Sequence, residues 1–439
     1  VMSNRDVANK RNGKREENSR YRKNDSNNRK ARSTSCSKRA KPEDKAMNDL
    51  SWYSRNPELL AAAARVPFPY KPGMTVSLGT QTGAKGSSPL KFKIPGVCAL
   101  TFAYSIGASN SASSPASIAA HEMYGRIRAN YSGSLEADAP DIMMYALALD
   151  QVHAYIAFLK RVYRLLNVYS PYNRDYPENV LRALDYYTDD VAELQEDKVK
   201  LWGVINTLVH MVNKFAVPND MDLYKRHRWM NENVYLDAPT PAAQSYVFVP
   251  YGFWIVDITG ETGTALKYLQ PEYTGVYRKL NAPTERIVDL MDKYGRKLID
   301  ALSNWDDAYT INGYIMRAFM NGAMLRAELL NQDEILQPVF EPEVLLQISN
   351  FTALASISTD SLGITQDPSS NILIHNPKTT NDASVRDYTA NPMLNVNSDA
   401  PTAADVTIAT RLQAWVEADT NVIHAATEIP IYVSIVLDA

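Results

Sequence analysis

The stretch "DIMMYALALDQVHAYIAFLKRVYRLLN" (141–167) decides the fold. Its apolar side chains recur at steps of three and four residues, which places them on one face of a helix. They are Ile142, Tyr145, Leu149, Val152, Ile156, Leu159, Tyr163 and Leu166. Asp138 can cap the start and Pro140 suits the first turn, while basic side chains favour the C-terminal end. The pattern predicts a long central helix, about 39 Å at 1.5 Å per residue.

Three further stretches predict helices, and helices are expected to dominate from about residue 116 to 335. The stretches are "TDDVAELQEDKVKLWGVINTLVHMVNKF" (188–215), "TERIVDLMDKYGRKLIDAL" (284–302) and "YIMRAFMNGAMLRAELL" (314–330). In the first of them Thr188 is the expected cap, and two aspartates follow it in the first turn, where they complement the helix dipole.

Strands are expected at both ends of this helical part. A strand-like run, "IPGVCALTFAYSIG" (94–107), follows a lead-in broken by Pro and Gly. Beyond residue 341, Ser, Thr, Asn and Pro loops separate short runs such as "NILIHN" (371–376). The fold class predicted is mainly α with a smaller β component, and the strands lie near 94–107 and in the C-terminal third.

The last residues read as one more strand, "IPIYVSIVLDA" (429–439), in which alternate apolar residues share one face. These are Ile429, Ile431, Val433, Ile435 and Leu437. An apolar strand that stays unpaired is an aggregation hazard, so it must pair within the chain or with a neighbour. The run is a weak indication of assembly.

Charge divides the chain into two parts. Residues 1–45 hold 15 Lys or Arg against 6 Asp or Glu, a net charge of +9, whereas the whole chain of 439 residues has −3 and the remainder therefore −12. The basic segment has almost no aliphatic residues, so it cannot bury enough apolar surface to offset the entropy of ordering. We predict a disordered arm that binds polyanions through phosphate neutralisation.

The predicted organisation has four parts. Residues 1–45 form the arm, 46–120 an extended lead-in with a strand, 121–340 a helical core, and 341–439 a strand- and loop-rich region. The arm could instead be a solubility tail, a nuclear-import signal or a membrane-surface patch, although it lacks the apolar face or lipidation site of a membrane anchor. It is no secretory signal, because no apolar core follows its charges.

Composition excludes several classes of protein. Only two cysteines occur, Cys36 and Cys98, which argues against a disulfide framework and suits a reducing compartment. The sequence shows no run of about 18 apolar residues, so no membrane span is expected. With 45% hydrophobic residues, the chain can bury a large core.

Motifs for chemistry are absent from the sequence. "GTQTGAKGS" (79–87) superficially resembles a phosphate-binding loop but fails its spacing, because Ala84 interrupts the Gly-Lys pair. The six histidines are scattered without metal-ligand spacing, and no nucleophile elbow or dinucleotide fingerprint appears. The sequence therefore predicts neither a catalytic nor a metal site, and no cofactor.

One basic cluster lies in the folded part, "KRHRWMNENVY" (225–235). Basic side chains beside Trp229 could hold a nucleic-acid backbone or stack a base. More often such a cluster is a helix end with solvated charges and a buried Trp, and this second reading is favoured about three to one.

Several of these residues carry a family resemblance. The stretches "NDLSWYSRNPELL" (48–60), "IPGVCALTFAYSIG" (94–107), "HEMYGRIRANYSG" (121–133) and above all "DAPDIMMYALALDQVHAYIAFLKRVYRLLNVYSPYN" (138–173) resemble the capsid protein of picobirnaviruses. The turn here reads "NYSG" where that family has a form like "NSG", and the arm is short and Asn-rich. A more distant partitivirus-like capsid therefore stays open.

The resemblance implies a function. Members of that family form icosahedral shells from symmetric, mostly helical dimers that enclose segmented double-stranded RNA, and some lose an N-terminal peptide by processing. By this resemblance the chain is a viral capsid protein rather than an enzyme, assembled in the host cytoplasm and located in the virion. Its partners would be itself, as a homodimer and a shell, and genomic RNA bound without sequence specificity, with no membrane anchor and no small-molecule substrate.

The arm would neutralise RNA that an acidic shell repels. The residues predicted to contact phosphates are Lys10, Arg11, Lys14, Arg15, Arg20, Arg22, Lys23, Arg29, Lys30, Arg32, Lys38 and Arg39. The alternative function is an RNA-coating nucleoprotein, or a cellular RNA-binding helical protein, that forms no closed shell.

Overall fold

The fold is that of a computed structural model, which places part of the chain. It describes residues 75–77, 91–93, 96–169, 176–219, 221–239, 243–260, 263–319, 324–354, 356–380, 394–396, 398–417 and 419–436. The chain divides into two units, Val1–Phe68 and Pro69–Ala439. The first unit, with the predicted disordered arm, lies outside the described residues, so the account below concerns the second. The division at residues 45, 120 and 340 stays a prediction.

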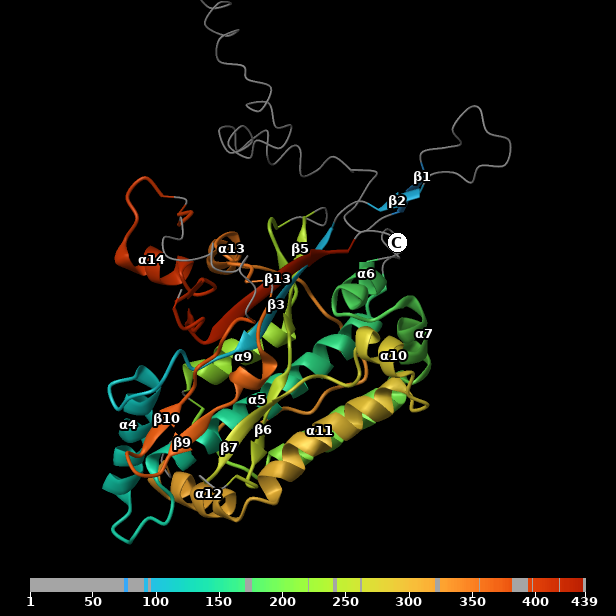
Figure 1. Ribbon diagram of the computed structural model, residues 1–439. Coiled ribbons are helices and arrows are strands. Elements are labelled where there is room, and N and C mark those ends of the chain that lie inside the picture. The colour runs from blue at the N-terminus through green and yellow to red at the C-terminus, as the bar shows by residue number, and fades with distance from the viewer. Residues whose placement is uncertain are drawn as a thin grey trace, which may run out of the picture. The chain divides into compact units, whose positions relative to one another are not determined.

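Helices outweigh strands in the described part of this unit (Figure 1). They are α4 (Pro115–Asn130), α5 (Ala139–Leu166), α6 (Tyr176–Ala183), α7 (Thr188–Glu196), α8 (Lys198–Val212), α9 (Asp222–Glu232), α10 (Gly275–Asn281), α11 (Ile287–Ser303), α12 (Asp306–Ala318), α13 (Pro342–Ser349) and α14 (Ala403–Ala409), with a 3₁₀ turn at Thr359–Leu362. The predicted mainly α fold is confirmed.

The strands are short, and most belong to two-stranded pairs. They are β1 (Thr75–Ser77), β2 (Lys91–Lys93), β3 (Val97–Tyr104), β4 (Tyr235–Leu236), β5 (Ser245–Pro250), β6 (Phe253–Asp257), β7 (Ala265–Leu269), β8 (Val339–Phe340), β9 (Thr365–Asp367), β10 (Ile372–Ile374), β11 (Ala414–Val416), β12 (Ile423–Ala425) and β13 (Glu428–Ile435). The two longest, β3 and β13, are the strands expected near 94–107 and at the C-terminal end.

The central helix is confirmed and is α5. The carboxylate of Asp141 accepts from the backbone N–H of Asp138, part of a capping box, and Pro140 lies in the first turn. The sequence pattern predicted one buried apolar face, but α5 is buried on every side. Its neighbours are α4, α8, α9, α11 and β6. Figure 1 shows it crossing the middle of the unit. By length and composition α5 could span a membrane, but its apolar window is wholly buried in protein, as in a core helix.

The main sheet has five strands in the order β13-β3-β5-β4-β8. β3 runs parallel to β5 and antiparallel to β13, so the segment between β3 and β5, which carries α4 to α9, crosses over one face of the sheet. The register of β13 against β3 shifts between Pro430 and Tyr432, a β-bulge. One large core cluster spans α5 and its neighbours, and a smaller one lies between the start of β13 and the β11–β12 pair.

Two predicted helices differ from the structure. The predicted helix 188–215 is split into α7 and α8 at Asp197, whose ψ of 13° leaves helical values and whose carboxylate lies 2.5 Å from Arg286. The predicted helix 314–330 is wrong in its second half, because α12 ends before Phe319 and residues 325–330 are extended.

Two side chains of α8 account for the extended segment. The Asn213 side chain donates to the carbonyl of Ala327 and accepts from its N–H, at 3.0 and 2.9 Å. Asn206 does the same for Leu330, at 3.1 and 2.8 Å. Because these amides satisfy backbone groups that a helix would otherwise pair, the segment lies along α8 without strand partners.

Candidate functional site

The twelve predicted RNA contacts, from Lys10 to Arg39, lie outside the described residues. Their role therefore stays a prediction. The sites that the structure does describe are the basic cluster of α9, the strand β13 that this cluster holds, and the hollows beside them.

The basic cluster of α9 faces inwards rather than towards a ligand. Arg226 and His227 point into the protein, and the ring of Trp229 packs against that of Tyr235 with centroids 4.8 Å apart. Lys225 and Arg228 remain exposed, and Arg228 lies 3.8 Å from Glu232. The indole is thus engaged by a neighbouring ring, and the cluster is a helix surface with two buried charges rather than a base-stacking site.

The buried charges form one chain of contacts, which we call the Glu428 network. The Nδ1 atom of His227 lies 2.5 Å from Oδ2 of Asp150, and its Nε2 atom lies 3.4 Å from Oε1 of Glu428. Arg226 donates two hydrogen bonds to the Glu428 carboxylate, of 2.6 and 2.9 Å, and a third, of 3.1 Å, to Gln347. The network joins α5, α9, α13 and the first residue of β13.

Electrostatics favour the charged forms of two members of the Glu428 network, His227 and Glu428. Burial disfavours a charged His227, but Asp150 and Glu428 outweigh burial and raise its pKa to about 9. Burial likewise disfavours an ionised Glu428, but Arg226 and His227 lower its pKa to about 2. At neutral pH His227 and Glu428 are therefore both charged, and their contacts fasten the start of β13 in the core.

Sequence reasoning missed this network because its members lie far apart in the chain. Asp150 and His227 are separated by 77 residues, and Arg226 and Glu428 by 202. One local signal was available. Asp150 interrupts the apolar run of the central helix, and a carboxylate there needs a buried cationic partner.

The second half of β13 is exposed, in contrast to the first. Ile429 and Ile431 are buried, whereas Tyr432, Val433 and Ile435 are 44%, 45% and 50% exposed. Of the alternate residues predicted to share one face of this strand, Ile429 and Ile431 are buried, whereas Val433 and Ile435 are exposed. The register against β3 shifts between the two pairs, at Pro430 to Tyr432. The fifth residue of that predicted face, Leu437, lies outside the described residues.

A groove adjoins the exposed half of β13. Tyr432 and Ser434 line it on one side and α10 residues Val276 and Tyr277 on the other, around a volume of about 290 Å³. Its floor is formed by β3 and β5, through Thr101 and Val249. Most of the lining surface is apolar, and two charged residues, Arg182 and Asp185, also line the groove.

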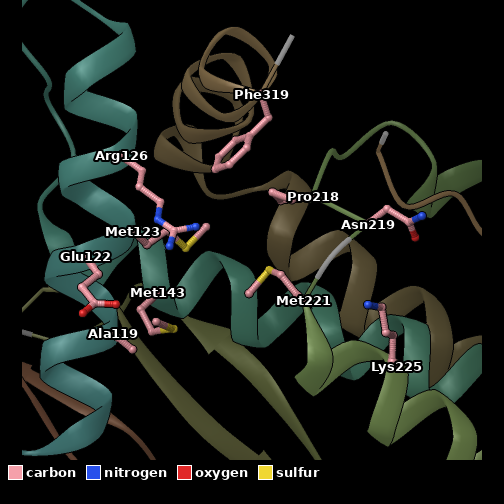
Figure 2. Close-up of a pocket in the computed structure, with 10 residues that line it drawn as sticks. All are labelled: Ala119, Glu122, Met123, Arg126, Met143, Pro218, Asn219, Met221, Lys225 and Phe319. Carbon is pink, nitrogen blue, oxygen red and sulfur yellow. The ribbon is translucent and has the colours of Figure 1, made fainter. Parts of the chain in front are cut away.

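A larger hollow of about 560 Å³ lies between α4, α9 and the end of α12 (Figure 2). Met123, Met143 and Met221 point into it, and Phe319 covers it from the side of α12. Glu122, Arg126 and Lys225 stand at its rim. Thioethers adapt to varied apolar shapes. Among the described residues that line the hollow, none is a nucleophile paired with a base.

Among the residues that the structure describes, no group of three or more His, Cys, Asp or Glu side chains is placed to hold a metal ion. Two further histidines, His153 and His375, are buried, and burial lowers their pKa to about 3 and about 4. They are packed as neutral rings in the core.

Comparisons of the sequence and of the fold with known proteins lead to one family. A family model described as "Picobirnavirus, Capsid protein" matches residues 52–436. The capsid protein precursor of a human picobirnavirus is 28% identical over 394 residues, which are 84% of this chain and 69% of that protein. The X-ray structure of the picobirnavirus capsid has the same fold, with a TM-score of 0.68 and 23% identity over 89% of this chain and 80% of that one.

Proposed function

The chain belongs to the picobirnavirus capsid protein family, and on that premise we propose that it forms two-fold dimers that close into an icosahedral shell around RNA. A capsid protein is a structural component of the virion and associates with copies of itself. The finer steps, namely dimer formation, icosahedral closure, RNA packaging by the arm and assembly in the host cytoplasm, are the proposal.

The observation that carries the RNA part is the division of charge. The segment ahead of the family match includes residues 1–45 with a net charge of +9, while residues 46–439 carry −12. A shell wall of net negative charge repels a polyanion, so confinement of RNA inside it needs a separate source of positive charge. The arm supplies that charge without base contacts, which explains packaging without sequence specificity.

The role proposed for the folded unit is structural. In its buried Glu428 network, the Glu428 carboxylate accepts from Arg226 and the His227 ring lies between two carboxylates. Such an arrangement fastens a strand.

The test removes most of the basic side chains of the arm in the full-length chain. The twelve predicted contact residues are changed together to glutamine, which keeps the length and polarity of the arm. We expect closed particles of unchanged size in negative-stain electron microscopy, with the ratio of absorbance at 260 and 280 nm falling to that of protein alone. A matched control changes twelve Asn and Ser residues of the same arm to glutamine and is expected to keep the RNA.

Two results would overturn the proposal. RNA content that survives the loss of these basic side chains would show that the arm does not hold the genome. Filaments whose length follows the RNA, in place of closed particles, would indicate a coating nucleoprotein. In the wild type, RNA binding by the arm should weaken with salt, with a slope of log K against log salt of at most about −6 to −8 for nine net charges.

A further inference from the structure

The exposed half of β13 is a sheet edge. On one side β13 pairs with β3 from Glu428 to Ile435, and the N–H of Val436 continues the ladder to the carbonyl of Val97. β13 is the outermost strand of the five-stranded sheet, so its other side faces no strand within the described part of the chain. This leaves a row of backbone donors and acceptors at Tyr432–Val436 beside half-exposed apolar side chains.

The segment Tyr432–Val436 lacks the features that prevent an edge strand from pairing with a strand of another chain. Monomeric proteins protect an edge strand with charged side chains, proline or a bulge. In β13 the charge of Glu428, Pro430 and the bulge all lie in the first half, where the strand is buried. The second half reads Tyr-Val-Ser-Ile-Val and carries no charge. An unprotected, apolar edge of this kind is typical of an interface.

We propose that Tyr432–Val436 pairs antiparallel with the same segment of a second copy about a two-fold axis, so that the sheet continues across two subunits. The inference rests on the proposed function, since it names the surface through which the capsid dimer forms. Antiparallel pairing is the geometry that a two-fold axis imposes on a strand that meets its own copy.

A second copy fits this edge better than an unrelated strand. A two-fold axis sets like side chains near each other, and like charges opposed across strands are destabilising. The segment Tyr432–Val436 contains no charged residue, so no like charges would meet across the axis. The charge of β13, on Glu428, is buried in the Glu428 network at the start of the strand. That network also fixes the strand before it reaches the edge, so the pairing segment is presented in an ordered register.

Cysteine cross-linking tests the proposal directly. In a full-length Cys36→Ser background, single cysteines replace Tyr432, Val433, Ser434 or Ile435. Cys98 is changed to alanine, because it lies opposite Ile435 in the β3–β13 ladder and could form a disulfide with a cysteine there within one chain. Opposed residues in an antiparallel pair have Cα atoms about 4.5–5.5 Å apart, within the span of a disulfide. In such a pair, only a residue next to the two-fold axis lies opposite the same residue of the second copy, so only there can a single cysteine form the disulfide.

The expected result is a disulfide-linked dimer whose yield is highest at one of the four positions and falls at the others. Leu280→Cys on α10 is the matched control, since Leu280 is apolar and 79% exposed but lies off the strand. We expect at least tenfold less cross-linked dimer from this control. Cross-linking that is equal at all positions and at Leu280 would contradict a defined strand pairing.

A charge substitution gives a second, independent measurement. The double variant Val433→Lys with Ile435→Lys places like charges across the proposed axis, and both side chains are half-exposed, so the fold should tolerate lysine there. We expect at least a hundredfold weaker self-association in sedimentation velocity, while Leu280→Lys stays as the wild type. Unchanged circular dichroism and melting temperature would establish that the variant is folded.

The outcomes separate this inference from the proposed function. If the wild type forms dimers and closed particles, but no cysteine cross-links and the lysine variant associates normally, the strand pairing is wrong and the capsid function stands. A cross-link from β13 to another segment of the chain, identified by mass spectrometry, also overturns it. If the wild type forms neither dimers nor particles, the proposed assembly itself fails.

Discussion

Replacing Glu428 by glutamine is expected to cost more stability than any substitution on the surface of this protein. Glu428→Gln keeps the volume of the side chain and removes one negative charge from the Glu428 network. The carboxylate is fully buried and accepts from Arg226 at 2.6 and 2.9 Å and from Thr427 at 2.7 Å. After the change, Arg226 and His227 both lose the carboxylate that they contact.

The magnitude follows from the loss of one partner of a buried pair. Removal of one partner leaves an uncompensated buried charge and costs about 3–5 kcal/mol. The pKa of Glu428, lowered to about 2, has the same sign, because the folded protein favours the ionised carboxylate that the variant lacks. We therefore expect the free energy of unfolding at pH 7 to fall by about 3–5 kcal/mol.

The sign of the pH dependence provides a further check. Because the pKa of His227 is raised to about 9 in the folded state, its stabilising contribution is complete below the unfolded value of 6.5 and is lost as the pH rises through 9. Glu428→Gln removes one of the two anions that raise this pKa. The loss of stability between pH 6.5 and 9 should therefore be smaller in the variant than in the wild type.

The assay is urea unfolding of the unassembled protein, followed by tryptophan fluorescence at pH 7 and 9. Glu417→Gln serves as the matched control, since its side chain is 49% exposed and its loss should change stability by less than about 0.5 kcal/mol. A decrease below about 1 kcal/mol for Glu428→Gln would refute the reasoning that the network fastens β13. Faster amide exchange confined to β13 would support it.

Three further substitutions test other contacts, each by urea unfolding. Arg161→Met should lower stability by about 2–4 kcal/mol, because the buried guanidinium donates to three backbone carbonyls that would lose their donor. Asn213→Ala removes both hydrogen bonds to Ala327 and should cost about 1–3 kcal/mol, with faster amide exchange in the segment along α8. Gly295→Ala should cost about 1–3 kcal/mol, since the new Cβ would lie 2.6 Å from Leu208, whereas Gly313→Ala, with open space around it, should be tolerated.

The features that sequence predicted are those set by local pattern. The central helix, the strand at β3 and the short strand β10 depend on periodicities within fewer than 30 residues, and each is present in the structure. The long apolar run could not show that α5 is buried on every side, because that depends on which other elements pack around it. The predicted RNA contacts of the arm lie outside the described residues and stay a prediction.

The features that sequence missed depend on distant partners. Residues 325–330 have good helix propensity but are extended, because Asn206 and Asn213 of α8 bind their backbone more than 110 residues away in sequence. The Glu428 network joins residues 77 to 202 positions apart. A single sequence carries no signal for such pairs beyond an isolated charge in an apolar run.

The distance between β3 and β13 in the sequence also sets a delay between the synthesis of the two strands. β3 is made early, at residues 97–104, but its partner β13 comes at residues 428–435. At about 5–20 residues per second, a ribosome needs about 15–65 s to cover that interval. During this interval one side of β3 has no strand to pair with, and the apolar edge proposed for the second copy does not yet exist. A subunit whose synthesis has not yet reached β13 would therefore lack the edge proposed for pairing with a second copy.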